Sequence, residues 1–139
     1  MILRVFSALA LVFFVVSATT GRPMAQEMDQ ERTHRFDPAL TLVMIEEVGC
    51  RWCATWNREI APIYPKTAEG QAAPLTRLDI HDPLPAGLTL KRAAFYTPTF
   101  ILVRDGAELA RIEGYPGEDF FWGLLGMMLM KHADFTGAS

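Results

Sequence analysis

The sequence predicts an α/β fold in which helices flank a central mixed β-sheet, in the order β-α-β-α-β-β-α. Three observations predict this fold. A nearly continuous apolar run, Leu40–Ile45, leads into a C-x-x-C motif at the start of a helical pattern. An Asp-Gly pair, Asp105-Gly106, lies between two strand-like runs, as the turn of a β-hairpin does. The last apolar stretch opens with acidic residues and closes with basic ones, which complements a helix dipole.

The first half of the fold follows from these patterns in chain order. Leu40–Ile45 is short and apolar enough to be a buried strand. The helix after it extends from the C-x-x-C to about Tyr64, and we expect Pro62 to kink or weaken it. The polar segment Lys66–Gly70 predicts a turn. Leu75–Ile80 alternates in polarity and therefore predicts a second strand.

The second half of the fold is expected to end in a hairpin and a helix. His81–Pro85 breaks the second strand, and Leu88–Phe95 predicts a short helix. Thr97–Val103 and Glu108–Glu113 predict the two hairpin strands. The closing helix, Glu118 to about Lys131, is apolar on nearly all sides. This pattern favours a helix packed against the sheet, and the alternative is a docking face for a partner or a membrane protein.

The N-terminus has the pattern of a secretory signal peptide, with a basic residue at Arg4, an apolar segment at Val5–Val16 and small residues after it. The apolar segment is shorter than the roughly 20 residues of a spanning helix. An uncleaved anchor is the alternative, because no clean cleavage motif is present. Either outcome predicts an exported, periplasmic domain. The expected organisation is a signal peptide at 1–25, a mobile lead-in at 26–36, one domain at 37–133 and a tail at 134–139.

The charge of the chain does not favour nucleic-acid binding. The formal net charge is −3, and loss of the leader, which carries Arg4 and Arg22 but no acid, lowers it to −5. A mildly acidic domain without a basic cluster lacks the electrostatic character of a nucleic-acid-binding protein.

The two cysteines of the chain, Cys50 and Cys53, indicate thiol-disulfide chemistry. Two intervening residues place the cysteines about one helical turn apart, which is close enough for a disulfide. Cys50 is expected to be the nucleophile, because the helix N-terminus favours a thiolate, and Cys53 the resolving thiol. Arg51 would further favour the Cys50 thiolate. Trp52 would offer apolar area to a partner chain.

Other uses of this motif remain to be weighed. A purely structural disulfide would close a very small loop and constrain the unfolded chain little. A metal site would need further ligands, for which the chain offers only His34, His81 and His132. We expect His81 to take part in a turn instead. Covalent haem attachment requires C-x-x-C-H, and Ala54 occupies the position of that histidine.

Several segments together resemble the SoxS-type periplasmic thioredoxin of bacterial sulfur-oxidation (Sox) clusters. The resemblance covers roughly Phe36 to Lys131. It rests on the segments Glu46–Cys53, Glu59–Thr67, Arg77–His81, Thr97–Phe100 and Arg111–Gly117.

This resemblance implies a thioredoxin-like fold and a thiol-disulfide reductant. It implies that Thr97-Pro98 is a cis peptide facing the C-x-x-C, where it would help to dock a substrate strand. It further implies a partner, the SoxYZ carrier of thiosulfate oxidation, and a membrane thiol reductase of the CcdA/DsbD type as electron source. The redox-active Cys50–Cys53 disulfide would be the sole redox group, with no cofactor and no metal.

The sequence also departs from general thioredoxins. Met44 stands where thioredoxins usually hold a buried aspartate, and Arg77 stands in place of the usual lysine. Proton transfer to Cys53 would then use Glu46, Glu47 or water, although both glutamates also suit a solvated strand end.

The predicted function is therefore a periplasmic oxidoreductase that reduces a disulfide or blocked cysteine on a partner protein. The alternatives are a periplasmic oxidant, a reductant serving cytochrome c maturation, and a non-catalytic metal-binding or regulatory module.

Overall fold

A computed structural model describes residues 40–136 of the chain. The predicted signal peptide and lead-in lie outside the described residues. A four-stranded sheet with the order β2-β1-β3-β4 forms the centre of the domain. β1 pairs in parallel with β2 and antiparallel with β3, and β3 pairs antiparallel with β4, so the predicted mixed sheet is confirmed. The strands are β1 (Thr41–Glu46), β2 (Leu75–Asp79), β3 (Thr99–Arg104) and β4 (Ala107–Glu113).

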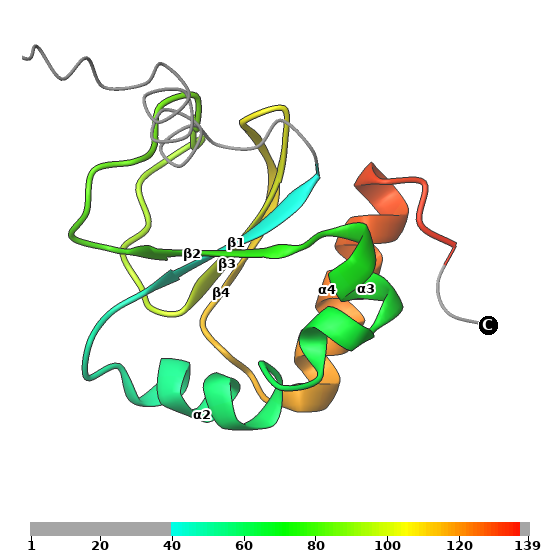
Figure 1. Cartoon of the computed structure of the whole chain (residues 1–139), viewed down its shortest axis with the longest axis horizontal. Helices are drawn as coiled ribbons and strands as arrows, with labels where there is room; N and C mark the ends of the chain where they lie inside the picture. The colour runs from blue at the N-terminus through cyan, green and yellow to red at the C-terminus, as the bar shows by residue number, and fades with distance from the viewer. Residues whose placement is uncertain (1–39, 137–139) are drawn as a thin grey trace, which may run out of the picture.

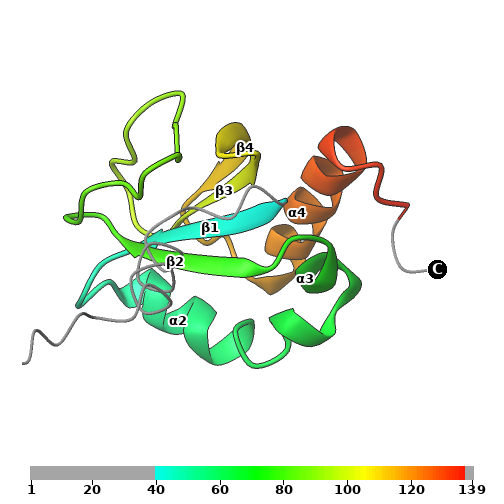
Figure 2. The ribbon, with the colours of Figure 1, turned by 45° about the horizontal axis from the view of Figure 1, so that its top comes forward.

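The described helices lie on one side of this sheet (Figures 1 and 2). The irregular segment between β2 and β3, residues 80–98, covers the other side. Side chains from alternate strand positions separate into two apolar clusters, one on each face, as the two-residue period of a strand requires. The larger cluster lies under the helices. The helical elements are α2 (Arg51–Glu59), the 3₁₀ turn η1 (Tyr64–Lys66), α3 (Ala68–Ala72) and α4 (Glu118–His132).

Aromatic side chains form the centre of the larger cluster. Trp56 on α2 is fully buried, and its ring lies 5.3 Å from that of Phe100 and 5.7 Å from that of Phe121. Trp56, Ile60 and Tyr64 recur at helical spacing, and all three are buried as this spacing predicts. Helix α2 nevertheless ends at Glu59, earlier than expected, because Pro62 cannot donate a hydrogen bond in a continuing helix.

Two local predictions were wrong. Lys66–Gly70, expected to be a turn, contains the start of α3, where the Thr67 hydroxyl accepts a hydrogen bond from the Gly70 N–H at 3.0 Å and caps the helix. Leu88–Phe95, expected to be a helix, is irregular. Its apolar side chains pack on the sheet face that the helices leave free. The segment takes its backbone hydrogen bonds from the edge of β4 instead of from a helix.

Helix α4 packs against the sheet, in agreement with the interpretation that the sequence favoured. Phe121, Leu125 and Leu129 are fully buried on one side of the helix, whereas Phe120 and Met127 are exposed. Among residues 40–136, no helix combines the length and the hydropathy that crossing a membrane requires. The docking role of the exposed side stays a prediction.

The predicted hairpin turn between β3 and β4 is present at Asp105-Gly106. Both residues have positive φ angles, 52° and 76°, as a type I′ turn requires. A β-carbon on Gly106 would lie 1.9 Å from the Gly87 carbonyl oxygen, so the irregular segment approaches this turn too closely for any other residue.

Candidate functional site: a disulfide at the start of helix α2

Cys50 and Cys53 form a disulfide at the start of α2, with their Cα atoms 5.3 Å apart. Cys50 is the N-cap residue of the helix and is partly exposed. Cys53 lies one turn further and only 2% of its surface is exposed. The two sulfurs therefore differ in access, and a partner can reach Cys50 but not Cys53.

The sulfur of Cys50 occupies the position at which a capping side chain meets the free N–H groups of a helix. Its Sγ accepts a hydrogen bond from the Cys53 backbone N–H at 3.0 Å. Once the disulfide is reduced, this N–H and the positive end of the helix dipole would favour a thiolate at Cys50.

A tight turn over residues 47–50 connects the end of β1 to α2. The Cys50 N–H donates to the Glu47 carbonyl oxygen at 3.2 Å, and Gly49 has φ +85°. This conformation favours glycine, as in a type II turn. Val48, at the tip of the turn, is 94% exposed and adds an apolar side chain beside the disulfide.

Met44 lies fully buried in the same apolar cluster as Cys53. Its neighbours in the sheet are Arg77 on β2 and Phe100 on β3. A methionine has no titratable group, so this position of the shared cluster offers no proton acceptor to Cys53.

The nearest acid along the same face of β1 is Glu46, which Arg77 engages. The Arg77 guanidinium donates to both carboxylate oxygens of Glu46 at 2.7 Å and also to the side-chain oxygen of Asn57 on α2. It also lies 5.7 Å from the centroid of the Trp56 ring. The hydrogen bond from Arg77 lowers the pKa of Glu46, which makes this carboxylate a weak proton acceptor.

Glu47 and His81 form a second pair at this end of the sheet. His81 Nε2 lies 2.9 Å from Glu47 Oε1, and the hydrogen bond that the protonated ring donates to Glu47 raises the pKa of His81. The His81 backbone N–H donates to Asp79 Oδ1, so His81 also takes part in the turn that the sequence predicted. Its contact with Glu47 was missed, because 34 positions separate the two residues.

Trp52 and Arg51 lie on the outer surface of the helix start. The Trp52 side chain is 54% exposed, as a docking residue requires. The Arg51 guanidinium carbon lies 5.8 Å from the centroid of the Trp52 ring, in a cation–π arrangement.

Thr97-Pro98 precedes β3 and forms a cis peptide bond, as the resemblance implied. Ile45 at the end of β1 pairs with Thr99 at the start of β3. Because these strands are antiparallel, the loop that carries Cys50 follows β1 and the loop that carries Pro98 precedes β3 at the same end of the sheet. Phe95 and Tyr96, just before this peptide, are 71% and 64% exposed. Their exposure was not predicted, because Leu88–Phe95 was expected to form a helix.

Neither His81 nor His132 joins the cysteines in a cluster, and His34 lies outside the described residues. Among residues 40–136, no three histidine, cysteine, aspartate or glutamate side chains come together as metal ligands would.

Comparison with solved structures identifies relatives of this fold. The periplasmic thioredoxin SoxS from Paracoccus pantotrophus, in a crystal structure of its reduced form, is 53% identical, with a TM-score of 0.65 over 66% of this chain and 97% of that chain. A thioredoxin from Fasciola hepatica is 17% identical, with a TM-score of 0.48 over 76% and 93% of the two chains. A thioredoxin from Malassezia sympodialis is 15% identical, with a TM-score of 0.47 over 72% and 84%.

No protein-family model matches the sequence, and no curated protein is significantly similar to it. The first of these structures is sufficient for the assignment, because more than half of the aligned residues are identical over nearly the whole of that relative. A C-x-x-C disulfide at a helix start, on a mixed sheet flanked by helices, agrees with it. The chain therefore belongs to the family of thioredoxin-like thiol-disulfide oxidoreductases represented by periplasmic SoxS.

Proposed function

We propose that the protein is a periplasmic reductant of protein disulfides, with Cys50 as nucleophile and Cys53 as resolving thiol. The observation that carries the proposal is the difference between the two sulfurs. Cys50 Sγ is accessible and accepts the Cys53 N–H, whereas Cys53 is buried behind it. The periplasmic location is supported by the predicted leader and by the 53% identical periplasmic relative.

The reaction transfers two electrons from the dithiol to the substrate. The Cys50 thiolate attacks one sulfur of the substrate disulfide, so a Cys50–substrate bond forms and the substrate S–S bond breaks. The departing thiolate takes a proton. The Cys53 thiolate then attacks Cys50, which restores the Cys50–Cys53 disulfide and releases the second substrate thiol.

The proton of Cys53 passes to water in this proposal. Met44 cannot accept it, and Arg77 holds Glu46 as an ionised carboxylate with a lowered pKa. The Glu47 carboxylate is engaged by His81 Nε2 at 2.9 Å. Arg51 adds positive charge beside Cys50, and exposure to solvent reduces its effect.

The substrate would lie against Trp52 and the Thr97-Pro98 loop. We propose SoxYZ as the natural partner, because the relative carries the SoxS name and the sequence resembles that family. A membrane thiol reductase of the CcdA/DsbD type would then return the disulfide to the dithiol. These assignments add no further cofactor and no metal to the reaction.

Substitution of the cysteines tests the chemistry and the partner separately. Cys50→Ser should abolish reduction of insulin disulfides by the purified protein in the presence of dithiothreitol, and retained activity would refute the assignment of the nucleophile. Cys53→Ser, expressed with its leader in the native host, should retain a partner bound to Cys50. The double variant Cys50→Ser/Cys53→Ser is the matched control, because it keeps the fold but cannot form the mixed disulfide.

The identity of the trapped protein decides between partners. Recovery of SoxYZ supports the Sox assignment, and recovery of a cytochrome c maturation factor would overturn it. A strongly oxidising reduction potential of the Cys50–Cys53 couple would favour the oxidant instead.

A further inference from the structure

The irregular segment between β2 and β3 lies along the outer edge of β4. The Thr89 N–H donates to the Gly106 carbonyl oxygen at 2.7 Å, and the Glu108 N–H donates to the Thr89 carbonyl oxygen at 3.1 Å. The segment thus covers part of an edge that would otherwise present unpaired backbone groups. It then continues to Thr97-Pro98 and the site.

A buried ion pair on β4 faces this segment. Arg111 Nε and Nη2 donate to the two carboxylate oxygens of Glu108 at 2.7 and 2.6 Å. The two side chains are only 8% and 3% exposed. Residues three apart on a regular strand point to opposite faces. A register shift opposite Leu102/Val103 places both on the same face.

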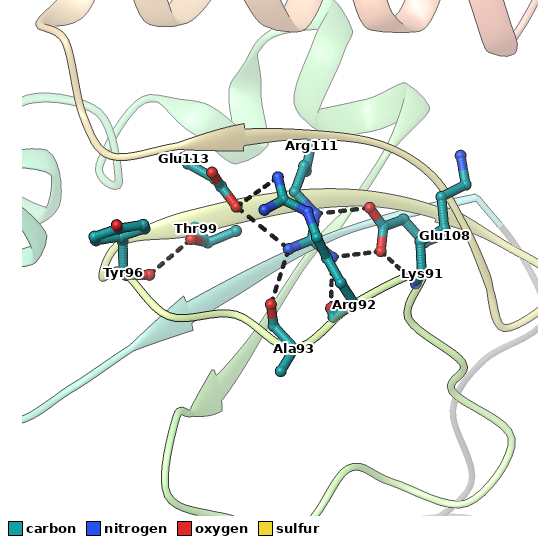
Figure 3. A network of polar contacts seen from close by, with 8 residues as sticks. All are labelled: Lys91, Arg92, Ala93, Tyr96, Thr99, Glu108, Arg111 and Glu113. Atoms are coloured by element: carbon teal, nitrogen blue, oxygen red, sulfur yellow. Dashed lines mark hydrogen bonds and ion pairs between the residues drawn. The ribbon is translucent and has the colours of Figure 1, made fainter.

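The pair binds the backbone of the segment at three successive residues (Figure 3). Arg111 donates to the carbonyl oxygens of Arg92 and Ala93 at 2.8 and 3.3 Å. Glu108 Oε2 accepts the Lys91 N–H at 2.8 Å. All three contacts are made to backbone atoms. These three contacts hold the backbone of residues 91–93 and do not involve the side chains of those residues.

Two further hydrogen bonds hold the segment at its other end. The Thr99 hydroxyl donates to the Tyr96 carbonyl oxygen at 2.7 Å (Figure 3). The Gly114 N–H donates to the Pro98 carbonyl oxygen at 2.8 Å. Residues 93–98 are thereby held at both ends.

Between these fixed points, Phe95 and Tyr96 face solvent, whereas Ala94 packs on the sheet and Pro98 is buried. Phe95 and Tyr96 are 71% and 64% exposed, and as neighbours in the chain they offer adjacent aromatic area to a partner. Aromatic side chains on a fixed backbone lose little conformational entropy when a partner packs on them. Their position next to Thr97 places them at the end of the sheet where the loop to Cys50 also leaves it.

We propose that the Glu108–Arg111 pair positions the Phe95–Thr97 segment as an aromatic docking surface for protein disulfides. The pair touches neither substrate nor sulfur and acts through the backbone of residues 91–93. Its role is to set the KM for protein substrates and not the reactivity of the dithiol. The inference rests on the proposed role of the Thr97-Pro98 loop in docking.

The test compares a protein disulfide with a small one. Insulin and hydroxyethyl disulfide are reduced by the wild-type protein and by Arg111→Gln, Arg111→Lys and Thr99→Val. We expect the KM for insulin to rise roughly tenfold (about 1.4 kcal/mol) in Arg111→Gln. Arg111→Lys keeps the positive charge but loses the paired guanidinium hydrogen bonds to Glu108, so the KM for insulin should rise less than in Arg111→Gln. The kcat/KM for hydroxyethyl disulfide and the reduction potential of the Cys50–Cys53 couple should not change.

A matched control separates positioning from loss of stability. Leu125→Val weakens the core under α4, on the opposite side of the sheet, and should leave both KM values unchanged. Phe95→Ala should raise the KM for insulin in the wild-type background but much less in Arg111→Lys, because both changes affect the same surface. If Arg111→Gln does not fold, Arg111→Lys and Thr99→Val decide the result.

Unchanged KM values for insulin in both Arg111→Lys and Thr99→Val would overturn the proposal. An equal rise in Leu125→Val, or an equal change for hydroxyethyl disulfide, would also overturn it. These outcomes differ from failure of the proposed function, in which the wild-type protein itself would not reduce insulin.

Discussion

Two glutamate–arginine pairs of nearly identical geometry lie in different surroundings in this protein. Arg77 binds Glu46 through two hydrogen bonds of 2.7 Å, and Arg111 binds Glu108 through bonds of 2.7 and 2.6 Å. The Arg77 and Glu46 side chains are 37% and 26% exposed, whereas those of Arg111 and Glu108 are 8% and 3% exposed.

The comparison shows that surroundings, not geometry, decide what such a pair does. The Glu46–Arg77 pair lies near the disulfide, where water can solvate either partner if the other is removed. The Glu108–Arg111 pair is largely shielded from water, so Glu108 depends on Arg111 and the Lys91 N–H. Arg111 is bound in addition by the carbonyl oxygens of Arg92 and Ala93 and, at 3.5 Å, by Glu113. We therefore expect the Glu46–Arg77 pair to be altered with little loss of stability, whereas the Glu108–Arg111 pair holds the backbone of residues 91–93 in place.

The largest expected effect is the difference in stability between two matched substitutions. Arg111→Met should lower the free energy of unfolding by about 3–5 kcal/mol, because it leaves the buried Glu108 carboxylate without its charged partner. Arg77→Met should lower it by about 0.2–1 kcal/mol, as for other exposed pairs. Urea denaturation of the oxidised protein measures both. Equal losses would show that burial does not distinguish the pairs.

A smaller effect is expected in the pH dependence of stability. Burial raises the pKa of Glu108, but hydrogen bonds from Arg111 and the Lys91 N–H outweigh it, so the pKa lies below its ordinary value of 4.5. A lowered pKa in the folded state stabilises the protein above the unfolded-state pKa, and this contribution is lost as the pH falls through the folded-state value. The stability advantage of wild type over Glu108→Gln should therefore shrink as the pH falls below about 4.5.

Glu46→Gln provides the matched comparison for this pH dependence. The pKa of Glu46 is also lowered, chiefly by the hydrogen bond from Arg77, so its effect has the same sign. It should be smaller, because solvent screens the partly exposed pair. Urea denaturation at pH 3 to 7 measures both differences, and an acid-side loss that is larger for Glu46 would contradict the comparison.

The smallest expected effect concerns the solvent-exposed Glu47–His81 pair. The hydrogen bond that His81 donates to Glu47 raises the pKa of His81 above its ordinary value of 6.5, and Glu47→Gln should lower it again. Any stability from this pair would be present below pH 6.5 and lost as the pH rises through the folded-state pKa. NMR titration of the His81 ring measures the shift. Glu46→Gln is the control and should leave the pKa of His81 unchanged.

The sequence predicted the elements whose signals are local. The apolar run of β1, the alternation in β2 and the Asp-Gly hairpin turn each depend on a few neighbouring residues, and all are present. The C-x-x-C at a helix start likewise predicted which cysteine is exposed, since the position within the first helical turn decides access. The resemblance added the cis peptide at Thr97-Pro98.

The elements that the sequence did not predict depend on tertiary contacts. The apolar residues of the Leu88–Phe95 segment suit a helix as well as an irregular chain, and only the edge of β4 and its ion pair select the second. The pairing of Glu108 with Arg111 was also missed. Regular alternation places these residues on opposite faces, and the register shift that overrides it has no clear sequence signal.

The register shift in β4 has a consequence for comparing relatives of this protein. Because Leu109 is an additional residue between the paired positions, a relative that lacks it could pair its strands regularly and still keep the two charges, then two positions apart, on the same face. A relative of the same length with regular pairing would instead place the two charges on opposite faces. In an alignment, a single-residue gap at Leu109 would therefore be compatible with the same ion pair and the same substrate-binding segment.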